Sequence, residues 1–191
     1  MIGLRVTDDD GLTATGTATI SVTNVAPTII AVTNNGPIIT NESTLITISA
    51  SDPIDPISYG FDCDGNNSYE VGPQASNSAY CLITTAGSIL VNVQVSDDDG
   101  GVTLDSTTVT VITPQEAIAK LQTDIQALIN GGQLNKGQGN ALIRNLNNGI
   151  KNGFINAVKG FINGGILTTA EGHPLVNTAN RIIAAIEKGN G

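Results

Sequence analysis

The chain has 191 residues, a formal net charge of −9, only 3% aromatic residues and no tryptophan. Residues 1–113 carry 13 acidic side chains against one basic, whereas residues 114–191 carry 4 acidic against 7 basic. The acidic part would repel phosphates, so we exclude nucleic acid as a partner, and it favours a hard cation such as calcium. No apolar run has the length of a transmembrane helix, and residues 1–7 lack the features of a signal peptide. We therefore expect any export signal to lie outside this sequence.

The first residues of the chain resemble a segment found 89 positions later. The motif VTDDDG at 6–11 recurs as VSDDDG at 95–100, and the register continues without a gap, so that Ile20 aligns with Val109 and Val22 with Val111. Alternating apolar and polar residues on both sides of a DDDG turn predict a β-hairpin. Residues 1–24 are then the last hairpin of one repeat, and residues 25–113 form one complete copy.

A hairpin cannot bury its apolar face alone. We expect the preceding repeat to be truncated in this sequence. The alternative is that residues 1–24 pair with another chain by strand addition.

Within the complete copy, short runs rich in β-branched residues alternate with turn residues. About seven short strands in one copy of this size predict a two-sheet sandwich with a separate α-helical part after it. We place the strands at 28–32, 44–50, 57–61, 69–71, 79–83, 88–96 and 102–112.

Several of these motifs together resemble the PKD family of immunoglobulin-like repeats, which occur in prokaryotic surface proteins and exported hydrolases. They are the 51–65 segment ending in FDCDG, Ala86-Gly87, the DDDG hairpin and the NVAP segment at 24–27. The resemblance covers residues 1–113 and implies a seven-strand immunoglobulin-like sandwich in a secreted or cell-surface protein. Phe61 stands where the family usually has tryptophan, which places the chain in a divergent, cysteine-containing subgroup.

A first candidate calcium loop lies at the end of the FDCDG segment. Oxygen-bearing side chains occupy positions 1, 3, 5 and 9 of this loop, the spacing of the first half of a calcium loop. Asn67 takes the usual glycine position, and Pro73 replaces the bidentate glutamate of position 12. The alternative is a polar turn in which these side chains cap backbone groups. The four predicted ligands are Asp62, Asp64, Asn66 and Glu70.

A second acidic group follows from the expected topology. In a seven-strand sandwich the 52–56 loop and the 97–99 turn lie at the same end as the entering linker, 24–27. Acidic loops facing a linker repel one another unless a cation neutralises them. The resemblance implies that calcium stiffens this joint between repeats in some members, whereas the alternative is a solvated hairpin turn. The predicted ligands are Asp52, Asp97, Asp98 and Asp99.

Cys63 and Cys81 are the only cysteines, and no histidine or further cysteine lies near them to complete a zinc set. We predict a disulfide, which would stabilise the fold by about 3 kcal/mol in the chain-entropy model. It would also place the protein outside a reducing cytosol. The alternative is a pair of buried free thiols.

The sequence contains little that suggests catalysis. His173 is the single histidine, next to Pro174, a setting typical of a turn or surface residue. No nucleophile elbow, phosphate loop or metalloprotease helix is present. The paired aspartates lie in turns, and the aromatic residues are too few for a typical sugar-binding cleft. We predict that this stretch is not an enzyme.

The pattern changes to helical at Thr113, where Thr113-Pro114-Gln115-Glu116 forms a capping box. Gly131-Gly132 ends this first helix, and three further helices are expected at 135–146, 152–163 and 177–188. Phe154 and Phe161 form a stripe that predicts bundle core, with a membrane-lying face as the alternative. The unit from 114 to 191 resembles the FIMAH-type helical domain of exported bacterial proteins through its segments 128–134, 142–146, 161–162 and 182–183.

These features lead to one main functional hypothesis. We predict an extracellular structural and adhesive module, a calcium-stiffened stalk repeat of a prokaryotic surface or secreted protein. Its expected partners are other repeats of the same protein and a cell-surface or matrix polymer. The alternatives are an accessory targeting tail of a secreted hydrolase, and a filament subunit that pairs with copies of itself through residues 1–24.

Overall fold

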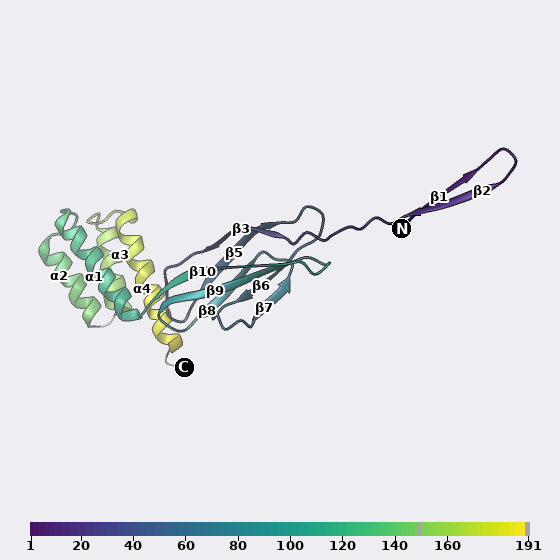
Figure 1. The fold of residues 1–191 in the computed structure, drawn as a ribbon. Coiled ribbons are helices and arrows are strands. Elements are labelled where there is room, and N and C mark those ends of the chain that lie inside the picture. The colour runs from purple at the N-terminus through teal and green to yellow at the C-terminus, as the bar shows by residue number, and fades with distance from the viewer. Residues whose placement is uncertain (149, 190–191) are drawn as a thin grey trace.

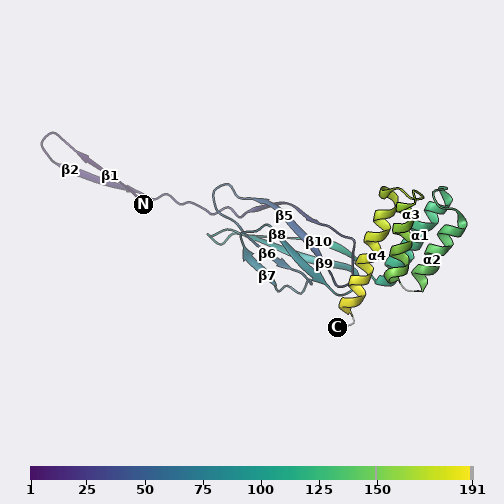
Figure 2. The same cartoon turned by 180° about the vertical axis from the view of Figure 1, so that it is seen from behind.

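The computed structural model describes residues 1–148 and 150–189 and divides the chain into three parts (Figure 1). A lone hairpin at the N-terminus leads through an extended linker into a β-sandwich, and a helical unit follows. Seen from behind, the hairpin and the helices again lie at opposite ends of the sandwich (Figure 2). The predicted boundaries near residues 24 and 113 fall at the linker and at the start of the first helix. Residues 190–191 of the predicted helical unit lie outside the described part of the chain.

The N-terminal hairpin consists of β1 (Ile2–Thr7) and β2 (Thr13–Ala18), which pair antiparallel. Its DDDG turn contains Gly11 at a φ of +85°, a conformation that glycine adopts without strain. The predicted hairpin is confirmed, but its second strand is shorter than expected. Ile20 and Val22 lie in the linker and outside any strand, because no other strand within residues 1–148 and 150–189 pairs with β1–β2.

The sandwich has the strand order of an immunoglobulin-like fold. One sheet has the order β3-β5-β8 and the other the order β4-β10-β9-β6-β7. β3, β5 and β8 correspond to immunoglobulin strands A, B and E, and β6, β9 and β10 to C, F and G. The bounds are β3 (Thr28–Asn34), β4 (Ile38–Ile39), β5 (Glu42–Ser51), β6 (Ser58–Asp62), β7 (Val71–Gln74), β8 (Ser78–Ile83), β9 (Gly87–Ser96) and β10 (Val102–Ile112).

The predicted seven-strand sandwich is confirmed, with two local corrections. β7 begins at Val71, so Tyr69 precedes the strand that was expected to contain it. The sequence did not predict β4, whose two residues pair parallel with the end of β10. Such a short strand has no periodicity of its own, and its pairing partner lies far away in the sequence.

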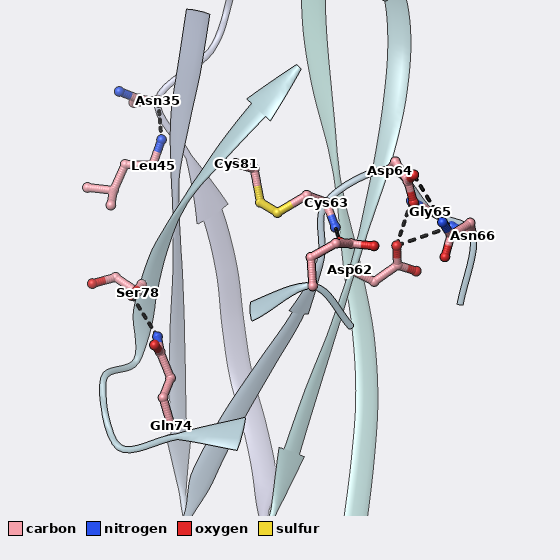
Figure 3. The surroundings of a disulfide bond; sticks show 11 residues. Asn35, Leu45, Asp62, Cys63, Asp64, Gly65, Asn66, Gln74, Ser78 and Cys81 are labelled. Carbon is pink, nitrogen blue, oxygen red and sulfur yellow. Dashed lines mark hydrogen bonds between the residues drawn. A yellow bond between two sulfur atoms is a disulfide. The ribbon is translucent and has the colours of Figure 1, made fainter. Parts of the chain in front are cut away.

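Alternation along the strands builds the core between the two sheets. Val91, Val93 and Val95 of β9 are fully buried, and Phe61 of β6 is buried beside them. Burial of one such side chain contributes about 1.5–3 kcal/mol. The predicted disulfide is confirmed: Cys63 follows β6 in one sheet, Cys81 belongs to β8 in the other, and their Cα atoms are 5.3 Å apart (Figure 3). The disulfide therefore links the two layers covalently.

The helical unit begins with no spacer after β10. Thr113 caps α1 (Pro114–Asn130) in the predicted capping box with Glu116. A similar box between Asn135 and Gln138 opens α2 (Lys136–Asn147). The remaining elements are a short irregular turn η1 (Ile150–Phe154), in which Lys151 has a non-helical ψ of −129°, and the helices α3 (Ile155–Asn163) and α4 (Thr169–Gly189).

The last helix is much longer than predicted. Thr168 and Glu171 form a third capping box, in which the Thr168 N–H donates to Glu171 Oε2 over 2.8 Å and the Glu171 N–H donates to Thr168 Oγ1 over 3.3 Å. His173 and Pro174 therefore lie inside α4 and not in a turn, and His173 is exposed, as expected of a surface residue. Pro174 is the sixth residue of α4, beyond the first turn, so it leaves the Ala170 carbonyl without its usual intrahelical donor. The helix was predicted to start too late because Gly172 and Pro174 are both unfavourable in helix interiors.

The helices enclose a core of their own. Phe154 is fully buried and Phe161 packs against the same cluster, so the predicted core role of this stripe is confirmed. Ile39 of β4 is 2% exposed and belongs to this helical core although it lies on the sandwich. No helix in the described part of the chain has the length and apolar character needed to cross a membrane.

Candidate metal centre

Three carboxylates meet at the linker end of the sandwich. Asp52 and Asp55 come from the loop between β5 and β6, and Asp97 comes from the turn between β9 and β10. One oxygen of each lies within 4.8 Å of the others. All three side chains are partly buried. The topology brings them together because both connections leave the same end of the sandwich.

The side chain of Asp52 is hydrogen-bonded to the backbone of its own loop. Its Oδ1 accepts hydrogen bonds from the backbone N–H groups of Ile54, at 3.0 Å, and Asp55, at 2.8 Å. These bonds fold the loop back so that Asp55 approaches Asp52. The other oxygen, Oδ2, is buried and has no hydrogen-bond partner among the described residues. A buried carboxylate oxygen without a partner is costly, and a bound cation would satisfy it.

Asp97 ties the DDDG turn to the linker. Its Oδ1 accepts from the N–H groups of Asp99, at 3.0 Å, and Gly101, at 2.6 Å. Its Oδ2 accepts from the side-chain amide of Asn24 over 2.9 Å. The bond from Asn24, followed by those from the backbone, lowers the pKa of Asp97 despite its partial desolvation. Asp97 is therefore held ionised at the point where the linker enters.

Asp55 experiences the opposite electrostatic environment. Partial desolvation, and after it the negative charges of Asp52, Asp98, Asp99 and Asp97, raise the pKa of Asp55. The group is therefore crowded by like charge. A hollow of about 250 Å³ lies between this loop and the linker, and its lining residues include Asn24, Asp52, Asp55 and Asp99.

The structure places the predicted residues of this group as follows. Asp52 and Asp97 meet, Asp99 lines the hollow beside them, and Asp98 is exposed and contributes only its charge. Asp55 was not among the predicted ligands. The sequence feature that could have indicated Asp55 is its position three residues after Asp52 in a short proline-containing loop. In such loops an aspartate side chain commonly accepts a hydrogen bond from a backbone N–H group two or three residues further along the chain.

The predicted calcium loop after β6 also brings its carboxylates together. Asp62, Asp64 and Glu70 each place one oxygen within 4.8 Å of the others. Asn67 adopts a left-handed φ of +68°, as predicted. The side chain of Asn66 is engaged within the turn, because its Oδ1 accepts from the Ser68 N–H over 2.7 Å and its Nδ2 donates to Asp64 Oδ2 over 3.0 Å.

Asp62 is fully occupied by hydrogen bonds, and Figure 3 shows it beside two of its donors, Gly65 and Asn66. An ionised carboxylate offers about four acceptor positions, and Asp62 accepts four bonds. These bonds outweigh the desolvation of this buried carboxylate and lower the pKa of Asp62. The donors are the N–H groups of Gly65 at 2.8 Å, Asn66 at 3.1 Å and Asn67 at 2.8 Å, and the Asn92 side chain at 2.8 Å.

Glu70 is also engaged, since its Oε2 accepts from the Cys63 N–H over 2.6 Å. This network favours the alternative of a polar turn that closes the segment after β6. Calcium in this loop stays a prediction. Among the described residues, no third group of histidine, cysteine or acidic side chains converges in the way that these two do.

Comparisons with known proteins give likenesses of fold. A scan against protein-family models and a search of curated proteins found no match. Among solved structures, the fibronectin(III)-like modules of Clostridium thermocellum CbhA are 25% identical, with a TM-score of 0.39 over 58% of this chain and 60% of theirs. The PKD1 domain of the Vibrio cholerae metalloprotease PrtV is also 25% identical, with a TM-score of 0.37 over 47% of this chain and 100% of that domain.

A structure described for carbohydrate-binding modules of the β-sandwich superfamily is 20% identical, with a TM-score of 0.42 over 48% of this chain. The present chain spans only 36% of that structure and 60% of the CbhA modules. The immunoglobulin-like fold itself follows from the strand order described above. The resemblances to the PKD and FIMAH-type families stay predictions.

Proposed function

We propose that this chain is a non-catalytic, extracellular structural module whose entering linker is stiffened by calcium bound at Asp52, Asp55 and Asp97. The observation that carries this proposal is the buried Oδ2 of Asp52, which has no partner among the described residues and lies in a cluster of like charges. Calcium takes six to eight oxygen ligands and accepts carboxylates in flexible geometry. The three carboxylates, with Asp99 at the rim of the hollow and water, supply ligands of this type.

The chemical effect of a cation here follows from the contacts of Asp97. One oxygen of Asp97 holds the linker through Asn24, and Thr103 donates a further bond to the Pro27 carbonyl. A cation that neutralises the repulsion around Asp55 fixes Asp97 and, through it, the linker. The direction in which the N-terminal hairpin leaves the sandwich is then set. Such a joint suits a stalk built from consecutive repeats.

Two features support the extracellular setting. The Cys63–Cys81 disulfide is of a kind that persists outside reducing cytosol. The hairpin and the helical unit lie at opposite ends of the sandwich, so the chain extends along one axis (Figures 1 and 2). A stalk or spacer in a prokaryotic surface or secreted protein uses this shape. The expected neighbours are further repeats of the same protein.

The proposal is tested by thermal unfolding with excess calcium and with a chelator. A ligand at a hundred times its Kd stabilises the folded state by about 2.7 kcal/mol. We expect calcium to raise the Tm of the natural chain, and Asp52→Asn and Asp97→Asn to remove that rise. Asp105→Asn is the matched control, because Asp105 lies on the same sandwich and, among the described residues, its side chain accepts a hydrogen bond only from its neighbour Ser106. It should retain the full rise.

A variant in the loop after β6 distinguishes the two candidate sites. Asp64→Asn should leave the calcium-induced rise unchanged. If the rise survives Asp52→Asn but is lost in Asp64→Asn, calcium belongs to the loop after β6 and the proposed joint is wrong. If the natural chain shows no rise at all, calcium has no structural role in this module.

A further inference from the structure

The N-terminal hairpin carries an apolar face that none of the described residues covers. Ile2 is 57% exposed, Leu4 66% and Val6 58%, and these alternate residues project from one face of β1. Opposite them on β2 lie Ala18, Gly16 and Ala14. A two-stranded hairpin is at best marginally stable in water unless such a face is buried.

The same face is buried elsewhere in this chain. With an offset of 89 residues, Ile2, Leu4 and Val6 correspond to Val91, Val93 and Val95, each of which is 0% exposed. The cross-strand pairing follows the same offset, since Ile2↔Ala18 corresponds to Val91↔Thr107 and Thr7↔Thr13 to Ser96↔Val102. All six pairs of β1–β2 have a counterpart in β9–β10. The hairpin therefore has the register and the inward face of strands F and G.

The contacts of β9 define what would cover β1. β9 pairs with β6, where Val93 lies opposite Phe61, and its buried valines pack against the inner face of the other sheet. That inner face includes Ile46 and Ile48 of β5. A partner for β1–β2 must therefore offer an open edge like β6 and an apolar layer like β5 and β8.

Neither its own sandwich nor a second copy offers this position. In each copy β9–β10 already occupies the place between β4 and β6. The hairpin of the same chain is directed away, because the linker is fixed by the bonds Asn24–Asp97 and Thr103–Pro27 (Figure 1). A copy from another molecule would have to displace an intact hairpin that is already buried.

We infer that β1–β2 is a docking surface for a preceding repeat of the same kind in the same polypeptide, one that lacks its own F and G strands. That segment is the equivalent of residues 25–89 and provides the layers built here by β3 to β8. The hairpin is the last part of one sandwich and at the same time the lead-in to the next. This inference is independent of calcium, because it depends on the apolar face and the register.

The test extends the full chain by a second copy of its residues 25–89, joined directly to Met1. Met1 corresponds to residue 90, so the join keeps the register. We expect a second β-sandwich, and the backbone amides of Ile2, Leu4 and Val6 should exchange with solvent as slowly as those of Val91, Val93 and Val95. The control inserts one extra residue at the join. This shift turns the apolar side chains to the other face, so the amides of Ile2, Leu4 and Val6 should still exchange rapidly with solvent.

Two outcomes would overturn the inference. An appended copy that stays unfolded on an otherwise intact chain shows that β1–β2 cannot complete a sandwich. A reversible dimer of the natural chain in sedimentation equilibrium that is abolished by Leu4→Asp but kept in Arg5→Asp assigns the face to a second copy. Neither result bears on the calcium-induced rise in Tm, so this inference and the proposed function fail separately.

Discussion

Arg181 of α4 and Glu42 at the start of β5 form a bidentate ion pair between the helical unit and the sandwich. Nε of Arg181 donates to Oε1 over 2.9 Å, and one terminal nitrogen donates to Oε2 over 2.7 Å. Oε2 of Glu42 also accepts from the Ile39 N–H over 2.7 Å, and Arg181 reaches the Pro37 carbonyl at 3.3 Å. The pair thus fixes the short segment between β3 and β5 against α4.

Further contacts surround this ion pair. The side-chain amide of Asn41 donates to the Ala185 carbonyl over 3.3 Å, and Ile39 lies in the helical core. Because α1 follows β10 without a spacer, the helical unit is attached both through the chain and across this contact. The sandwich and the helices therefore form one structural unit, and the linker at the other end of the sandwich is the joint to the N-terminal hairpin.

The first prediction concerns this junction. Arg181→Ala should lower the stability of the sandwich–helix unit by about 1 kcal/mol. A bidentate ion pair with a half-buried partner stabilises a fold only slightly more than an ordinary surface ion pair does. Calorimetry should then show the helices unfolding before the sandwich. Lys151→Ala is the control, since Lys151 pairs with Glu187 within the helical unit and both side chains are largely exposed. An equal effect of both substitutions would contradict a special role for the junction.

The second prediction concerns pH. Burial opposes ionisation of Glu42, but the bonds from Arg181 and Ile39 outweigh it, so the pKa of Glu42 is lowered. Its contribution to stability is therefore complete above the unfolded pKa of about 4.3 and is lost as the pH falls through the lower folded value. Glu42→Gln should lower the Tm at pH 7, and the difference between the natural chain and the variant should shrink at pH 3. A difference that stays constant with pH would contradict this origin.

Local features of the sequence predicted most of the elements. The Thr113 capping box, the DDDG turns and the alternation in β9 and β10 each depend on residues close together in the chain. The Arg181–Glu42 pair has no local signal, because its members are separated by 139 residues. β4 escaped prediction for the same reason, since its two residues pair with β10 and contact β5 and α4, which lie far from it or give no local signal in the sequence.

The sequence predicted where the candidate metal centre lies, but only some of the residues that form it. The end of the sandwich followed from strand topology, which placed Asp52 and Asp97 together. The contribution of Asp55 depends on how the Asp52 side chain folds its own loop, and spacing alone does not determine this. The saturation of Asp62 likewise depends on Asn92, which comes from a different strand.

The third prediction is that Asp55→Asn changes the Tm in opposite directions with and without calcium. Asp55→Asn removes one of several like charges, so in chelator at pH 7 the variant should melt a few degrees above the natural chain. Because the pKa of Asp55 is raised, this gain belongs to pH values above the folded pKa and should vanish once the pH falls below about 3.9, the unfolded value. With calcium the order should reverse, because a ligand is lost. A variant that is less stable in both conditions would show that the carboxylate has another structural role.

The fourth prediction concerns the disulfide. Replacing both Cys63 and Cys81 by alanine should destabilise the sandwich by about 3 kcal/mol, the value expected for a closed loop of this length. For a sandwich of about 90 residues the Tm should fall by roughly 12–24 °C. Treatment of the natural chain with a reductant should produce a similar shift and leave the double variant unaffected. A double variant that still responds to reductant would assign the effect to something other than this bond.

The fifth prediction concerns Gly101, which lets the linker pass close to the DDDG turn. A Cβ atom at this position would meet the side chain of Asp97 and would lie 2.8 Å from the Cα of Ala26 and 2.9 Å from Nδ2 of Asn24. The backbone of Ala26 cannot yield without moving the linker. Gly101→Ala should therefore destabilise the chain by about 1–3 kcal/mol, the usual cost of overpacking.

The measurement is the NMR signal of the Asn24 side-chain amide, which should lose its protection from solvent in Gly101→Ala. Gly16→Ala is the control, because a Cβ atom there meets nothing within 4 Å. The residue that corresponds to Gly101 in the N-terminal hairpin is Leu12, so a joint at that turn could not seat a linker in the same way. If Gly101→Ala kept the Asn24 signal unchanged, the close passage of the linker would not be what holds this joint.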